Sequence, residues 1–165
     1  MPMIRKAKVE DAAAMHALQQ LAFAEEGRRS GTRDIPPLQE DSASIARHIE
    51  EQIALVAMRD GRLVGSVRGV KGENGYVVRA LVVHPSCQGE GIGSTLLRSL
   101  EAVLPSNAWI DLTTNTVMEG NVPFYEKHGY RVHERTTPFP GVVLAHMRKD
   151  VAGDTSPVAP VDPAT

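Results

Sequence analysis

Apolar and polar positions along the chain follow first a strand-like, then a helical and then again a strand-like period. Residues 4–8 alternate as a short strand, and apolar residues at helical spacing follow Asp11, which is placed to cap a helix. Glycines and prolines break this pattern over residues 25–37, so we expect a loop there. Asp41 is then placed to cap a second helix.

The middle of the chain predicts three successive antiparallel strands. Two tight turns, Asp60-Gly61 and Asn74-Gly75, separate apolar segments at residues 53–58, 62–70 and 76–84. The third segment is nearly continuous in apolar residues, which is typical of a central strand buried on both faces.

A clear amphipathic helix follows over residues 94–104, where leucines and a valine form a broad apolar stripe that Pro105 ends. The next strand, residues 109–113, must then lie parallel to the strand before the helix. A short helix over residues 122–128 and two final strands, 130–134 and 142–147, complete the pattern. We therefore predict an α+β (α/β) fold with a mixed sheet of about seven strands.

Composition and charge narrow the class of protein. With 165 residues, 42% of them hydrophobic, the chain is long enough for one domain with a core of its own. Eighteen basic against 20 acidic residues disfavour a nucleic-acid binder, and the apolar runs are too short for a membrane helix or a signal peptide. One cysteine excludes an internal disulfide, and the histidines lack metal-ligand spacing. We expect a soluble, cytoplasmic protein without a metal.

Candidate chemistry is concentrated between the third of these strands and the long helix. Gly89, Gly91 and Gly93 stand at alternate positions directly before the helix. Glycines let the backbone approach a ligand closely, and the first N–H groups of a helix have no partners within it. Together with the helix dipole, this arrangement predicts an anion cradle suited to a pyrophosphate.

Two common phosphate-binding loops do not fit this segment. Ser94 stands where the dinucleotide pattern G-x-G-x-x-G requires its last glycine, and no Gly-Lys-Ser/Thr follows for a P-loop. Antiparallel strands before the loop also disfavour a Rossmann fold.

A different pattern, Q-x-x-G-x-G, fits Gln88, Gly91 and Gly93, directly after a strand of the form L-x-V-x-P that begins at Leu81. This segment resembles the acyl-CoA signature of the GNAT N-acetyltransferase superfamily. The opening IRKAKVEDA, the hairpin RDGRLVGSVRG and the late segment NVPFYEKHGYRV also resemble that family, in its order. Four such motifs in sequence cover residues 1–150 apart from parts of the 25–41 loop. We expect residues 151–165 to form a flexible proline-rich tail.

The resemblance implies a fold and a set of cofactor contacts. It implies a mostly antiparallel sheet flanked by about four helices, with the parallel fourth and fifth strands splayed apart to form the slot for the thioester. The strand containing Leu81, Val82 and Val83 is implied to pair with the pantetheine arm of acetyl-CoA. Main-chain N–H groups of the following loop are implied to bind its pyrophosphate; the loop consists of Gln88, Gly89, Glu90, Gly91, Ile92, Gly93 and Ser94.

The resemblance also points to three side chains further along. Tyr125 resembles the family's tyrosine beside the sulfur, a proton donor for the departing thiolate; the alternative is that it only packs in the core. Asn121 resembles the asparagine that bonds the pantetheine, but its spacing to Tyr125 is short. Asn115 is therefore a rival for that role, and Asn121 could instead cap a helix. Val77 stands where some members have a catalytic glutamate, so the general base is not identified.

The resemblance implies an acyl-CoA-dependent N-acyltransferase that moves acetyl from acetyl-CoA to a primary amine. We expect a small-molecule acceptor and a monomer or homodimer. Two alternatives stay open: an acetyltransferase of protein or peptide amines, and a non-catalytic acyl-CoA-binding module on the same fold.

Overall fold

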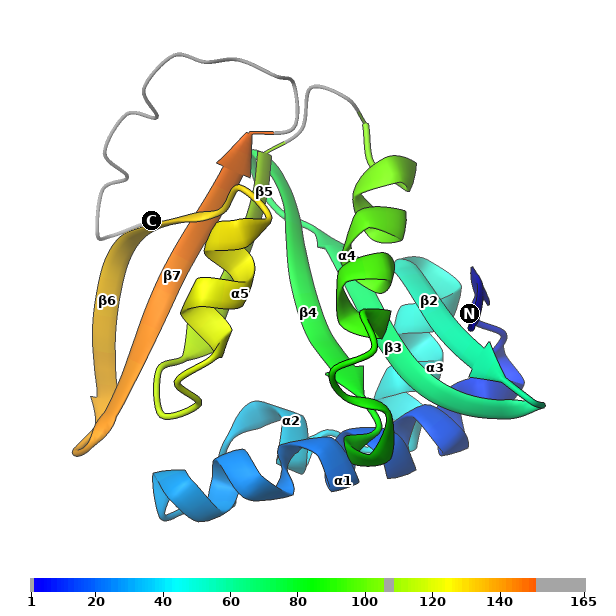
Figure 1. The fold of residues 1–165 in the computed structure, drawn as a ribbon, viewed down its shortest axis with the longest axis horizontal. Coiled ribbons are helices and arrows are strands. Elements are labelled where there is room, and N and C mark those ends of the chain that lie inside the picture. The colour runs from blue at the N-terminus through cyan, green and yellow to red at the C-terminus, as the bar shows by residue number, and fades with distance from the viewer. Residues whose placement is uncertain (1, 106–108, 151–165) are drawn as a thin grey trace. The chain divides into compact units, whose positions relative to one another are not determined.

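The computed structural model describes residues 2–105 and 109–150, and this part of the chain contains seven strands and five α-helices (Figure 1). The strands form one mixed sheet in the order β1-β2-β3-β4-β5-β7-β6. This sheet confirms the predicted architecture. The described residues divide into two compact units, the first with residues 2–71 and 78–104 and the second with residues 72–77, 105 and 109–150. The predicted tail, residues 151–165, lies outside the described residues.

The first unit contains most of the helices. Its elements are β1 (Met3–Lys6), α1 (Ala12–Ser30), α2 (Pro36–Gln39), α3 (Ser42–Glu51), β2 (Ile53–Arg59), β3 (Arg62–Lys71), most of β4 (Gly75–Val83) and α4 (Ile92–Val103). The β2–β3 hairpin turns at Asp60 and Gly61 with φ values of 51° and 76°. Two successive left-handed residues are typical of a type I′ turn, so the predicted hairpin is confirmed.

The prediction of a loop over residues 25–37 is wrong in its first part. Helix α1 continues to Ser30 and ends at Gly31, which has a φ of 73°. Gly27 lies inside this helix, at a point where there is no room for a side chain. A Cβ on Gly27 would lie 2.7 Å from Leu38 Cδ1. The single-turn helix α2, which carries Leu38, makes five helices where the sequence predicts about four.

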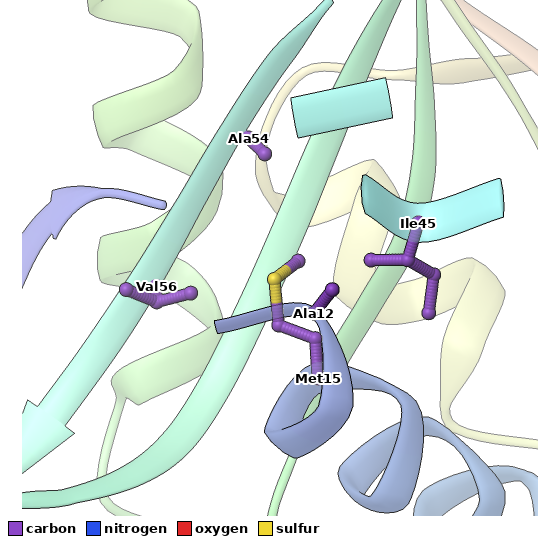
Figure 2. Packing of buried hydrophobic residues seen from close by; sticks show 5 residues of the cluster. All are labelled: Ala12, Met15, Ile45, Ala54 and Val56. Carbon is purple, nitrogen blue, oxygen red and sulfur yellow. The ribbon is translucent and has the colours of Figure 1, made fainter. Parts of the chain in front are cut away.

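Helices α1 and α3 pack on one face of β2, as Figure 2 shows for five buried residues. Ala12 and Met15 from α1, Ile45 from α3, and Ala54 and Val56 from β2 form this cluster. The cap of α3 is the predicted one, because Asp41 Oδ1 accepts a hydrogen bond from Ser44 N at 2.8 Å. Asp11, predicted to cap α1, instead bonds the side chain of Arg5 and the main chain of Lys8.

Helix α4 packs on β3 (Figure 1), and two glycines of that strand lie against it. A Cβ on Gly65 would lie 2.9 Å from Leu96 Cδ1, and one on Gly69 would lie 3.0 Å from Leu100 Cδ1. The leucines therefore occupy the space that side chains on β3 would need. Because α4 is held this closely to the strand, the position of its N-terminus is fixed within the first unit.

A buried ion pair ties α1 and α2 to β3. The Arg68 guanidinium on β3 is buried, donates to both carboxylate oxygens of Glu40 at 2.9 and 2.6 Å, and also bonds Gln19 Oε1. Burial by itself would raise the pKa of Glu40. The hydrogen bonds from Arg68 and Gln19 outweigh burial and lower the pKa to about 2 from an ordinary value of 4.5.

This pKa shift predicts a loss of stability in acid. The folded-state pKa of Glu40 lies below the unfolded value, so the stabilisation is complete above pH 4.5 and is lost as the pH falls toward 2. The loss should be about 3 kcal/mol of unfolding free energy. Urea denaturation between pH 4.5 and pH 2 should show this loss of unfolding free energy in the wild type and not in Glu40→Gln. Glu50→Gln, which changes an exposed glutamate of α3, is the control and should lose stability in acid as the wild type does. If Glu40→Gln also loses stability as the wild type does, Glu40 is not the cause of the loss.

The second unit contains the start of β4, then β5 (Trp109–Asn115), α5 (Asn121–Lys127), β6 (Arg131–Phe139) and β7 (Val142–Asp150). The parallel ladder between β4 and β5 joins Gly75–Val77 to Trp109–Asp111 and stops there. This short ladder agrees with the predicted pair of strands that part toward their C-terminal ends. Strands β6 and β7 are longer than the sequence predicts, because their outer halves carry few of the apolar residues that reveal a strand.

Candidate active site

The segment between β4 and α4 has the backbone geometry of an anion cradle. Gly89 and Gly91 have φ values of 82° and 83°, a region that favours glycine. A Cβ at either position would meet nothing within 4 Å, and residues 88–91 are exposed. Both glycines are thus needed for the path of the chain, while the space beside them is open.

Helix α4 begins at Ile92, two residues earlier than predicted, with Gly91 as its N-cap. Its first hydrogen bond runs from Thr95 N to Gly91 O at 3.0 Å, and Thr95 Oγ1 bonds the same carbonyl. The N–H groups of Ile92 and Gly93 come before that bond and point out of the helix end. Ile92 is 2% exposed, so its side chain belongs to the core and its backbone alone is available to a ligand.

Strand β4 is central in the sheet but is not buried on both faces as predicted. Val78 and Val82 are buried, whereas Leu81 and Val83 are half-buried. Ala80 has a φ of 51°, which is unusual for a residue with a Cβ and marks an irregularity within the strand. The predicted contact residues therefore lie directly after a distorted and partly exposed stretch of backbone.

A short 3₁₀ turn, Pro85–Cys87, joins β4 to the glycine loop. His84 Nδ1 accepts a hydrogen bond from Ser86 N at 3.1 Å, so this histidine caps the turn. Cys87 is buried. These contacts fix the point at which the loop leaves the strand.

Asn121 and Asn115 make different contacts in the second unit. Asn121 Nδ2 donates to Thr114 Oγ1 at 2.9 Å, and the N-cap of α5 is Gly120, so Asn121 is not the helix cap considered above. Asn115 is 4% exposed, and its Oδ1 accepts from Val117 N at 3.0 Å, which closes the turn after β5. Of the two, Asn121 is the more exposed side chain.

Tyr125 lies near the end of α5 and is half-buried. Its ring contacts Phe124 and Tyr130 edge to face, with centroids 5.1 and 5.9 Å apart. Its carbonyl oxygen accepts hydrogen bonds from the main chain of His128 and Tyr130. The ring is thus held by aromatic neighbours, and the Tyr125 backbone is held by the turn that follows α5.

One contact of the glycine loop is not predicted from the sequence. Arg59, the last residue of β2, bonds Glu90 Oε1 at 3.0 Å. No local pattern connects these residues, because 31 positions separate them and the fold alone brings them together. An open pocket of about 540 Å³ lies beside the β2–β3 hairpin and is lined by Met3, Arg5, Met58, Arg59, Asp60 and Gly61. None of these residues is a predicted acetyl-CoA contact.

The described residues contain neither a candidate metal centre nor a candidate membrane helix. No group of three or more His, Cys, Asp or Glu side chains in this part of the chain is arranged to hold a metal ion. Within the same residues, no helix has the length and apolar character needed to cross a membrane.

Comparison with known families identifies the class of protein that this fold and loop define. Residues 24–151 match the model of the acetyltransferase (GNAT) domain. The match covers most of the chain, and the protein therefore belongs to the GNAT acetyltransferase family. Members of this family are acyl-CoA-dependent N-acetyltransferases.

Individual relatives are similar to the chain over part of its sequence or in fold. It is 35% identical over 77 residues to a glucosamine 6-phosphate N-acetyltransferase of Trypanosoma brucei brucei, a match that spans 47% of this chain and 44% of that protein. The PaiA N-acetyltransferase of Thermoplasma acidophilum, solved in complex with coenzyme A, is 22% identical with a TM-score of 0.73 over 91% of this chain and 99% of its own. The ribosomal-protein-S18-alanine N-acetyltransferase of Escherichia coli is 16% identical, with a TM-score of 0.76 and coverage of 96% and 99%. At these identities, the solved structures establish the fold.

Proposed function

We propose that this protein transfers acetyl from acetyl-CoA to a primary amine on a small molecule. The observation that carries the proposal is the exposed loop at the start of α4, with left-handed Gly89 and Gly91 and open space beside both. This loop offers main-chain N–H groups to an anion, as acyl-CoA binding requires. Family membership supports the same reaction.

The contacts follow from the loop and from β4. The main chain of residues 88–94 binds the pyrophosphate, and residues 81–83 pair with the pantetheine arm as an added strand does. The partial exposure of Leu81 and Val83 favours this role, because a fully packed central strand would leave no surface for a ligand. Asn121 supplies a side-chain contact to the pantetheine, since Asn115 is buried and bonded to the turn after β5.

The chemistry needs few groups from the protein. The neutral amine attacks the thioester carbonyl, an oxyanion forms, and the C–S bond breaks as the tetrahedral intermediate collapses. Main-chain N–H groups of β4 near Ala80 stabilise the oxyanion. Tyr125 gives its phenolic proton to the departing thiolate, whose conjugate acid has a pKa of about 8.5 against about 10 for a phenol. The amine proton passes to solvent, and solvent returns a proton to the Tyr125 phenolate, which closes the cycle.

A small acceptor is favoured by the relative from Trypanosoma brucei brucei, whose name specifies an amino sugar phosphate. The chain matches less than half of that protein, so the amino sugar phosphate is the first acceptor to test and not an assignment. A thiol-release assay with acetyl-CoA should include it with polyamines, aminoglycosides and peptides. Amine-dependent release of CoA supports the enzyme, whereas binding of acetyl-CoA without release by any amine favours a binding module.

Gly91→Asp should weaken acetyl-CoA binding at least about tenfold, which corresponds to about 1.4 kcal/mol. The new carboxylate stands at the N-cap of α4, where the pyrophosphate is proposed to lie. Gly91→Asn is the matched control, because it adds a side chain of the same size and the same backbone strain without the charge. Calorimetry should show a larger loss for the aspartate, and equal affinities for both variants and the wild type would contradict the binding site.

A further inference from the structure

Glu90 places a negative charge in the middle of the proposed pyrophosphate loop. Among residues 85–95, Glu90 carries the one formal charge. Its flanking glycines are the two left-handed ones, so the carboxylate is attached to the part of the backbone that must approach the anion. A carboxylate at this position repels a pyrophosphate unless a cation offsets it.

Arg59 is the cation that meets this carboxylate. Arg59 Nη1 lies 3.0 Å from Glu90 Oε1, and it also lies 3.9 Å from the sulfur of Cys87, at the start of the loop. Both contacts belong to the first unit. Arg59 ends β2, so the β2–β3 hairpin holds its backbone in place.

A role in stability does not account for this pair. The side chains of Arg59 and Glu90 are 31% and 44% exposed. Ion pairs as exposed as this contribute little to folding, because solvent screens the attraction and two long side chains lose freedom. An effect on the potential at the loop is different, since it acts on every anion that arrives there.

We propose that Arg59 is a positioning residue for acyl-CoA binding. Arg59 neutralises Glu90 and holds the Glu90 carboxylate so that the loop can accept the pyrophosphate. The proposal rests on the proposed function of the loop. It predicts that the loss of Arg59 lowers the affinity for acyl-CoA because Glu90 is left unpaired. The affinity should therefore return when Glu90 is also made neutral.

A double-mutant cycle tests this coupling, with the affinity for CoA measured by calorimetry on the full chain. Arg59→Gln should weaken binding about tenfold. Arg59→Gln combined with Glu90→Gln should return to within about twofold of the wild type, and Arg59→Lys should keep most of the affinity because it keeps the charge. Arg62→Gln, which removes the same charge from the same hairpin, should change the affinity little.

The outcomes separate this proposal from the function on which it depends. If Arg59→Gln binds CoA as the wild type does, or if the double variant is as weak as Arg59→Gln, the neutralising role of Arg59 is overturned. In either case, weak binding by Gly91→Asp relative to Gly91→Asn still supports the loop as the acyl-CoA site. If the wild type itself does not bind CoA, the proposed function fails instead.

Discussion

Replacing Tyr125 with phenylalanine is expected to lower kcat by on the order of 10²-fold while leaving the affinity for acetyl-CoA nearly unchanged. The change removes the phenolic proton but keeps the ring, which contacts Phe124 and Tyr130 edge to face. Packing is therefore retained, and the loss should fall on the step in which the thiolate departs. Turnover at saturating amine and acetyl-CoA is the measurement, made with the acceptor that the amine panel identifies.

Tyr130→Phe is the matched control, because it removes a hydroxyl from the neighbouring ring of the same aromatic group. Tyr130 is 1% exposed, so its change should cost stability and leave kcat close to that of the wild type. If Tyr125→Phe behaves in the same way, with wild-type kcat and a lower unfolding free energy, Tyr125 is a core residue and has no part in the chemistry.

Gly75→Ala is expected to destabilise the protein by at least about 3 kcal/mol, near the upper end for overpacking. Gly75 begins β4, and a Cβ built there would clash with the carbonyl oxygen of Trp109 on β5. The obstacle is backbone, so no side-chain rotation can relieve it. The clash also falls within the three-pair ladder that joins β4 to β5, so the strands must part for the methyl group to fit.

Gly72→Ala provides the comparison, because its nearest contacts are at 3.6 Å and an added methyl group fits there. Urea denaturation of both variants should give a lowered midpoint for Gly75→Ala and a nearly unchanged one for Gly72→Ala. Equal midpoints for Gly75→Ala and the wild type would show that β5 does not approach β4 as closely as described.

The sequence predicts the fold well wherever the structure follows local rules. The Asp60-Gly61 turn, the Asp41 cap and the apolar stripe of α4 each depend on a few neighbouring residues, and each is found as predicted. The extension of α1 through Gly27 is missed, because the close packing of Leu38 beside this glycine involves a residue that is distant in sequence. Local propensity disfavours glycine in a helix, and tertiary packing decides otherwise.

The candidate site shows the same division. The glycine loop can be recognised from spacing alone, because a turn into a helix needs left-handed residues at fixed positions. The partial exposure of β4 cannot be predicted from the sequence, since a partly exposed strand and a buried strand can have the same apolar composition. The sequence also does not predict the ion pair of Arg59 with Glu90 or the hydrogen bond of Asn121 with Thr114. Each of these contacts requires two elements to be brought together by the fold.

The proposed reaction moves an acetyl group from acetyl-CoA to an amine. The direct test is mass spectrometry of a reaction containing acetyl-CoA labelled with ¹³C in its acetyl group and the panel of primary amines. A labelled acetyl amide is expected on one amine, in amounts equal to the CoA released and dependent on the protein. Labelled acetyl-CoA that remains intact with every amine in the panel would contradict it.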